Sequence, residues 1–278
     1  MNRISKLSYC FFLNGERGLE VLKLFDNKKL KILNVFVAKK FLKSHILKDI
    51  SKKINFRLID NLNQRIIINT LKDTDIALSC GFPLIFKKSI IDLPRMGFLN
   101  CHAGILPKYR GGSPLNWQLI NCEKSFGISV IKINHKIDGG YIYSQRKFMI
   151  KKKYDINSLH KIANKNFPGM IIESINKILK NKKPKKIKKN SIVWNQRTSK
   201  DSNFNFKTMT FDQADRFVKA LQKPYPNAFF YFKNIKYEIL KVNKSKKKLK
   251  PGDILLKSRS MHLGLKDKTV KTKFKIAI

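Results

Sequence analysis

Polar side chains that could do chemistry gather between residues 97 and 140. Asn100 and His102 lie one residue apart at the end of an apolar run. If that run is a strand, the two side chains point the same way and can share a crevice at its carboxyl end. An amide can stabilise a developing oxyanion, while an imidazole can accept a proton from an attacking nucleophile or stabilise charge near it. The pair therefore predicts acyl transfer, although Asn-x-His alone also fits a polar turn.

A loop and a carboxylate further along the chain add to this pair. The loop after His102 contains Tyr109, Arg110 and a glycine pair at 111–112, and a helix is predicted after Pro114. Backbone N–H groups and a guanidinium at one place suit the capture of phosphate or a nucleotide. Asp138 follows on a Gly-rich turn, where a carboxylate beside His102 would orient the ring.

Together these motifs resemble the signature of the folate-dependent formyltransferases. NCHAGILPKYRGGSPLNW at 100–117 and IDGG at 137–140 match Asn-x-His, then Leu-Pro-x-Tyr/Trp-Arg-Gly, then Asp-x-Gly. The similarity extends over about residues 75–230. It implies an enzyme of the hydroxymethyl-, formyl- and related transferase class, in which a primary amine takes the formyl group of N10-formyltetrahydrofolate. No metal is implied, because this donor co-substrate is already activated.

The resemblance also implies roles for individual residues. Asn100 would stabilise the oxyanion, His102 would be the base or electrostatic partner at the amine, and Asp138 would hold His102 and help move the proton through water. The residues expected to bind the folate are Phe82, Pro83, Leu84, Ile85 and Ile137. Those expected to bind the second substrate are Tyr109, Arg110 and Gly111.

Two further motifs favour an amino sugar linked to a nucleotide as the acceptor. Segments 113–117 and 224–229 resemble the enzymes that formylate such sugars, with Asn227 where Gly is usual. Asn can adopt a positive φ at some cost, so the turn can be kept with Asn227 in place of Gly. Residues 38–45 lack the insertion rich in Pro, Gly and Arg that is usual in methionyl-tRNA formyltransferases. Initiator methionyl-tRNA is therefore the alternative acceptor.

The elements that must position these residues follow a βαβ rhythm. Strands are expected at 7–12, 32–38, 56–59, 76–79 and 97–101, with helical spacing at 19–25 and 46–54. This rhythm predicts an α/β fold, a Rossmann-like and mostly parallel sheet with helices on both faces. Two more strands are expected at 126–133 and 141–148, followed by a long helix that Pro168 should kink or split.

The rest of the chain differs in composition and in the pattern of its apolar residues. Residues 180–190 read KNKKPKKIKKN, which predicts a linker or an exposed strap. After about residue 207, a helix capped by Thr210 precedes short strands, as in a small β-rich, OB-like domain. We therefore expect a catalytic domain at 1–185, a linker at 186–206 and a C-terminal domain at 207–278.

The net charge of +42 arises from 60 basic and 18 acidic residues among 278. Only 10 of the basic residues are Arg, and Lys accompanies abundant Ile and Asn, so a bias towards A/T-rich codons explains the charge as readily as an anionic partner does. A hydrophobic content of 42% excludes a wholly disordered chain. A basic nucleic-acid-binding protein without catalysis is the rival class, but it leaves the Asn-His-Asp set unexplained.

The pattern of apolar residues and the number of cysteines indicate the cellular compartment in which the protein is expected. No apolar run reaches 18 residues, and the apolar stretch 7–13 lacks a cleavage site, so neither a membrane span nor a secretion signal is expected. Four scattered cysteines fit a reducing cytosol, and Cys101 should point into the core. We expect a cytoplasmic enzyme whose partners are folate and a nucleotide sugar, with a homodimer left open.

Overall fold

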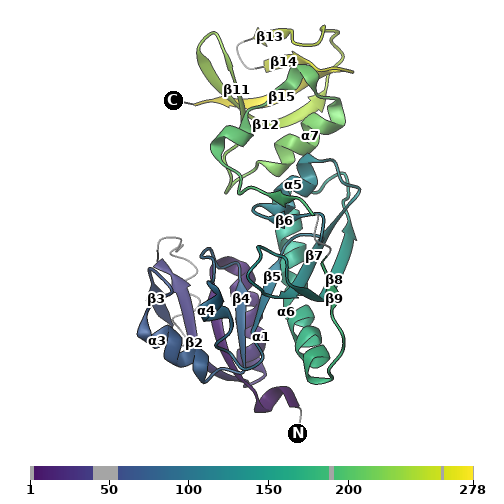
Figure 1. The fold of residues 1–278 in the computed structure, drawn as a ribbon. Helices are drawn as coiled ribbons and strands as arrows, with labels where there is room; N and C mark the ends of the chain where they lie inside the picture. The colour runs from purple at the N-terminus through teal and green to yellow at the C-terminus, as the bar shows by residue number, and fades with distance from the viewer. Residues whose placement is uncertain (1–2, 40–55, 188–190, 258–259, 278) are drawn as a thin grey trace. The chain divides into compact units, whose positions relative to one another are not determined.

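The computed structural model describes residues 3–39, 56–187, 191–257 and 260–277 (Figure 1). Two compact units emerge, and neither is one continuous stretch of chain. Unit 1 comprises residues 1–110, 127–147 and 161–193, and unit 2 comprises residues 111–126, 148–160 and 194–278. The helical spacing at 46–54 lies outside the described residues.

Unit 1 is built on an eight-stranded sheet with the order β3-β2-β1-β4-β5-β7-β8-β9. The first five strands in this order pair in parallel, whereas β5 pairs with β7, and β8 with β9, in antiparallel fashion. The strands are β1 (Ser8–Leu13), β2 (Lys31–Ala38), β3 (Arg57–Ile59), β4 (Ile76–Cys80), β5 (Phe98–His102), β7 (Ser125–Lys132), β8 (Tyr141–Met149) and β9 (Lys185–Lys186). The expected mostly parallel α/β sheet is confirmed.

Helices cover both faces of this sheet. On one face, Phe25 of α1 packs edge-on against Tyr9 and Phe11 of β1, at 4.8 and 5.2 Å between ring centroids. On the other face, Phe12 and Phe98 join a buried cluster with residues of α3 and α4. Alternate β1 side chains thus reach opposite faces, so every residue of β1 is buried and all but Ser8 are apolar. The helices of this region are η1 (Arg3–Lys6), α1 (Gly15–Asn27), α3 (Arg65–Lys72), α4 (Lys88–Ile91) and α6 (Ile156–Leu179).

Two expectations for the middle of the chain need correction. Helix α6 runs through Pro168 without being split. Proline removes only one backbone hydrogen bond, and the fully buried Phe167, Met170 and Ile171 keep both sides of it packed. The described residues of the lysine-rich segment are mostly exposed, as expected, but the segment is not only a linker, because Lys185 and Lys186 pair with the start of β8 and extend the sheet.

Unit 2 contains a five-stranded antiparallel sheet in the order β11-β12-β15-β14-β13. These strands are β11 (Ala228–Phe232), β12 (Ile235–Lys244), β13 (Ile254–Lys257), β14 (Ser260–Gly264) and β15 (Thr269–Ile276). Helices α5 (Pro114–Ile120) and α7 (Phe211–Ala220) are joined by a hydrogen bond from the Asn116 amide to the Ala220 carbonyl, 2.8 Å. The remaining short elements are η3 (Ser199–Ser202), η4 (Phe206–Thr208) and the paired β6 (Arg110–Gly111) and β10 (Val193–Trp194). The β-rich C-terminal region is confirmed.

Asn227 is not among the residues with a positive φ. Its amide instead donates to Glu238 Oε2 across the β11–β12 pair, at 2.8 Å. Since this turn makes no demand for the left-handed region, Asn in the place of Gly carries no backbone cost.

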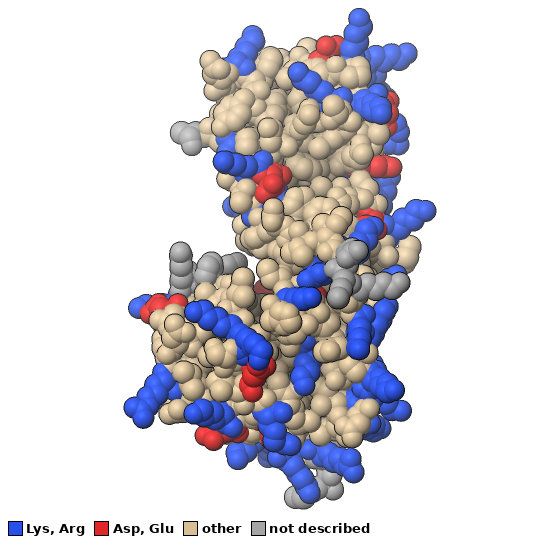
Figure 2. All heavy atoms as spheres, viewed as in Figure 1, with Lys and Arg blue, Asp and Glu red and all other residues tan. Residues whose placement is uncertain are grey.

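Lys and Arg side chains are scattered over the visible face of each unit, with far fewer acidic ones (Figure 2). Within the residues that the structure describes, no helix has both the length and the apolar character needed to cross a membrane.

Candidate active site

The sheet places Asn100 and His102 together at the end of β5. Phe98, two residues before Asn100, belongs to the cluster under α3 and α4, so strand alternation turns Asn100 and His102 to that same face. His102 is buried, whereas Asn100 is partly exposed. A partly exposed amide at the carboxyl end of a strand is available to a ligand.

Asp138 reaches the imidazole from the turn between β7 and β8. Its Oδ2 lies 3.3 Å from His102 Nδ1. The other ring nitrogen, Nε2, lies 2.5 Å from the carbonyl oxygen of Tyr109. A doubly protonated ring donates to both oxygens, whereas a neutral ring can donate to only one. The predicted pairing of Asp138 with His102 is therefore present, and the Tyr109 carbonyl contacts the second nitrogen of the ring.

The turn that carries Asp138 is built by close contacts. Asp138 itself has a φ of +43°, which Asp tolerates better than most residues do. Arg110 donates from Nε and Nη2 to the Ile137 carbonyl, at 2.9 and 2.6 Å. A side chain at Gly140 would overlap the Lys132 carbonyl, so Gly is required there. Arg110 and Gly140 together fix where the Asp138 carboxylate points.

The residues predicted to bind the second substrate have other contacts in this structure. Besides its two bonds to Ile137, Arg110 donates from Nη1 to Ser191 Oγ, 3.0 Å, and the residue is buried. The Tyr109 side chain is fully buried, and the backbone carbonyl of this residue faces His102. Gly111 has a φ of +89°, which explains a glycine at that position. Substrate binding by these three remains a prediction.

The residues predicted to bind folate form an apolar loop after β4. Phe82 and Leu84 pack against the cluster that contains Phe98, while Pro83 and Ile85 are exposed, Ile85 to 76%. Ile137 is half exposed. Alternate residues of the loop thus anchor it and present apolar surface, as a site for a flat aromatic ligand requires. Folate binding itself remains a prediction.

Cys101 points away from the site, as strand alternation predicts. Its Sγ lies 3.6 Å from Cys80 Sγ, and both thiols are buried. Burial, with the neighbouring Cys80, holds the pKa of the Cys101 thiol well above its ordinary value. A thiol with so little thiolate is a poor nucleophile.

Sequence reasoning missed two arginines. Arg17 of α1 donates to the Cys101 carbonyl, between Asn100 and His102, at 3.2 Å, and lies over the Phe167 ring. In unit 2, Arg197 lies over the Trp117 ring and donates to Ser202 Oγ at 3.3 Å, and burial lowers its pKa. Contacts between these guanidinium groups and aromatic rings could not be predicted from the sequence, because neither arginine belongs to a recognisable motif.

Among the described residues, no three His, Cys, Asp or Glu side chains lie close enough to hold a metal ion.

Comparison with known proteins identifies matches along most of the chain. Residues 38–175 match the formyl transferase family, and residues 197–273 match the formyl transferase C-terminal domain. The bifunctional polymyxin resistance protein ArnA of Wigglesworthia glossinidia brevipalpis is 34% identical over 88% of this chain and 37% of its own length. A methionyl-tRNA formyltransferase of Wolbachia sp. subsp. Drosophila simulans is 26% identical over 70% of this chain and 63% of its own length. The chain thus spans less than two thirds of either relative.

Among solved structures, WlaRD, described as a sugar 3N-formyl transferase in the presence of dTDP and 5-N-formyl-THF, shares the fold. The TM-score is 0.72 at 18% identity, over 98% of this chain and 99% of that one. The likeness therefore extends over both units.

Proposed function

Because the chain belongs to the folate-dependent formyltransferase family, we propose that it transfers the formyl group of N10-formyltetrahydrofolate to a primary amine. The observation that carries the proposal is the placement of Asn100, His102 and Asp138 at one end of β5, with His102 Nδ1 3.3 Å from the carboxylate. An oxyanion donor beside an oriented imidazole is what attack on a formyl carbon requires.

The reaction forms one C–N bond and breaks another. The amine attacks the formyl carbon, and the Asn100 amide donates to the oxygen that becomes negative. His102 faces two acceptors, Asp138 and the Tyr109 carbonyl, so it acts as an electrostatic partner to the developing charge. The amine proton passes through water, aided by Asp138, to N10 of the folate. Collapse of the intermediate breaks the bond between N10 and the formyl carbon and releases tetrahydrofolate.

We propose a nucleotide-linked amino sugar as the acceptor. The segments 113–117 and 224–229 support this choice, as does the shared fold with a sugar 3N-formyl transferase crystallised with dTDP. A diphosphate on the substrate would be favoured by the charge of +42. Under this proposal, the amino group that receives the formyl group belongs to a small molecule.

Initiator methionyl-tRNA is the second candidate acceptor. The observation in its favour is the likeness to methionyl-tRNA formyltransferases of several organisms. The same positive charge would attract a tRNA backbone.

One assay separates the two acceptors. The purified protein is incubated with formyl donor and either a dTDP- or UDP-linked amino sugar or charged initiator tRNA, and N-formyl product is measured by mass spectrometry. Formylation of the sugar at a rate well above that of tRNA is the expected result. Formylation of tRNA alone would replace the sugar, and no transfer to any amine would refute the reaction.

A further inference from the structure

The loop 103–109 determines the surroundings of His102, because it supplies the carbonyl that faces the ring. Tyr109 contributes that oxygen, 2.5 Å from Nε2. Gly104 lies so close to the ring that a Cβ there would overlap His102 Nε2 and the Tyr109 carbonyl. Any displacement of this loop therefore moves or tilts the imidazole.

Two polar side chains outside the predicted catalytic set hold this loop in place. Ser129 of β7 is opposite His102 in the antiparallel register and is fully buried. Its hydroxyl donates to the Gly104 carbonyl at 2.8 Å. Gln145 of β8 donates from Nε2 to the Leu106 carbonyl and to Ser129 Oγ, each at 3.0 Å. Side chains of two sheet strands thus hold two carbonyls of the loop in place.

The direction of these hydrogen bonds is fixed by the number of protons. A serine hydroxyl has one proton, and a primary amide has two. Because Gln145 donates to Ser129 Oγ, that hydroxyl directs its own proton to Gly104. The series of hydrogen bonds from Gln145 to Ser129 and on to Gly104 therefore has one arrangement. A buried hydrogen-bond series of this kind favours a single conformation of the loop that it holds.

We propose that Ser129 and Gln145 are positioning residues that hold the loop 103–109 and, through it, the imidazole of His102. This inference deepens the proposed function and rests on it. Neither side chain needs to touch either substrate. A misplacement of about 1 Å at a catalytic group lowers turnover by about a hundredfold, so loss of these bonds should reduce kcat far more than it changes KM.

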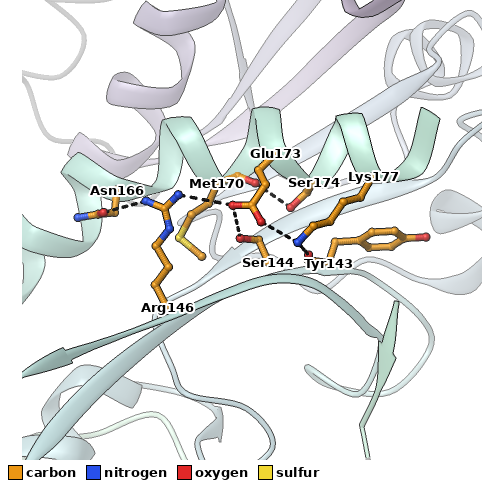
Figure 3. A network of polar contacts seen from close by, with 8 residues as sticks. All are labelled: Tyr143, Ser144, Arg146, Asn166, Met170, Glu173, Ser174 and Lys177. Atoms are coloured by element: carbon orange, nitrogen blue, oxygen red, sulfur yellow. Dashed lines mark hydrogen bonds and ion pairs between the residues drawn. The ribbon is translucent and has the colours of Figure 1, made fainter. Parts of the chain in front are cut away.

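The test compares Ser129→Ala with Ser174→Ala. Ser174 is also fully buried, but its hydroxyl donates only within α6, to the Met170 carbonyl at 2.7 Å (Figure 3). We expect Ser129→Ala to lower kcat at least about tenfold, with KM for both substrates nearly unchanged. Ser129→Thr, which keeps the hydroxyl, should recover most of the turnover. Ser174→Ala should retain wild-type kcat at a comparable loss of thermal stability.

A second pair of variants covers the case in which Ser129→Ala does not fold. Gln145→Leu removes the amide at a partly exposed position, and Gln222→Leu is its control, because Gln222 donates to the Leu240 carbonyl in unit 2 at 3.2 Å. We expect kcat to fall with Gln145→Leu and not with Gln222→Leu.

Wild-type kcat in folded Ser129→Ala or Gln145→Leu, or equal losses in a variant and its control, would overturn the inference. An inactive wild type would instead refute the proposed function. In that case the ring 15N signals of His102 still test the positioning, since they should shift in Ser129→Ala but not in Ser174→Ala. Unchanged signals in both variants would overturn it.

Discussion

At the scale of single residues, the pairing of Asp138 with His102 gives the site its chemistry. The carboxylate lies on a turn that Arg110 and Gly140 hold, and the imidazole lies at the end of a buried strand. The turn, the Arg110 side chain that holds it and the strand that carries His102 together bring the carboxylate and the imidazole within 3.3 Å of each other. A change of charge on Asp138 should affect turnover without changing the shape of the site.

Asp138→Asn makes that change with a side chain of the same size. The neutral amide still contacts His102, but it no longer stabilises positive charge on the ring, so kcat should fall at least about a hundredfold. Circular dichroism and thermal unfolding should match the wild type within error, because the turn keeps its backbone contacts. Steady-state kinetics checks this, and a kcat within twofold of wild type would contradict the assigned role.

Sequence reasoning was strongest at this scale. The resemblance to the formyltransferases implied the pairing of Asp138 with His102, and strand alternation predicted the inward-pointing Cys101. It did not predict that the Tyr109 carbonyl would face His102, because a backbone oxygen carries no sequence signature. Nor did it predict that Arg110 would hold the Ile137 carbonyl, since a guanidinium binds carbonyls and phosphates with the same fork of donors.

At the scale of elements, helix α6 is joined to β8 by a polar network (Figure 3). Glu173 accepts hydrogen bonds from Ser144 and Lys177, at 3.0 and 2.6 Å, and lies 3.5 Å from Arg146. Burial alone would raise the pKa of Glu173, but the hydrogen bonds and the charges of Lys177 and Arg146 outweigh it and lower the pKa. Glu173 therefore stabilises the folded state in its ionised form.

Glu173→Gln should reveal this as a pH-dependent loss of stability. A carboxylate whose pKa is lowered on folding contributes stability above its ordinary pKa of 4.5, and that contribution disappears as the pH falls through the folded value. The difference in Tm between wild type and variant should thus be largest near neutral pH and shrink below about pH 4.5.

Glu20→Gln is the control, because it removes an exposed carboxylate that lies 3.6 Å from Lys23. A Tm difference for Glu173→Gln that stays constant or grows on acidification would show that the network does not favour the ionised form.

The N-terminus of α7 shows how far local sequence can determine an element. Thr210 Oγ1 accepts from the backbone N–H of Gln213 at 3.4 Å, as the predicted cap by Thr210 requires. Gln213 Oε1 in turn accepts from the backbone N–H of Thr210 at 2.8 Å, which completes a capping box. Contacts within four residues are enough to form it. By contrast, the continuity of the helix at Pro168 depends on packing from distant parts of the chain, so local rules did not exclude a split there, and the alternative of a kink stays a prediction.

Thr210→Ala should lower the free energy of unfolding by about 1 kcal/mol. The reason is that the first turn of α7 loses one of its side-chain acceptors. Thr208→Ala, an exposed hydroxyl two residues earlier and outside α7, is the matched control. Urea denaturation measures both, and equal losses in the two variants would show that the cap contributes nothing specific.

At the scale of the whole molecule, the order of elements was predictable and the division into units was not. Periodicity predicted the central strands β1 and β4 of the parallel sheet because each is a buried and mostly apolar run. The units instead draw on segments from separate parts of the chain, and contacts between distant segments decide which elements cluster. On the face seen in Figure 2, Lys and Arg side chains are scattered over each unit, and the charge of +42 does not by itself identify an acceptor.

The assignment is tested most directly by single-turnover formyl transfer from N10-formyltetrahydrofolate to the accepted amine. Wild-type protein is compared with Asn100→Ala and His102→Ala under donor concentrations that saturate each. Loss of an oxyanion donor or of the oriented imidazole should slow transfer by about a hundredfold or more, with donor binding and thermal unfolding unchanged. Transfer at the wild-type rate in either variant would contradict the account.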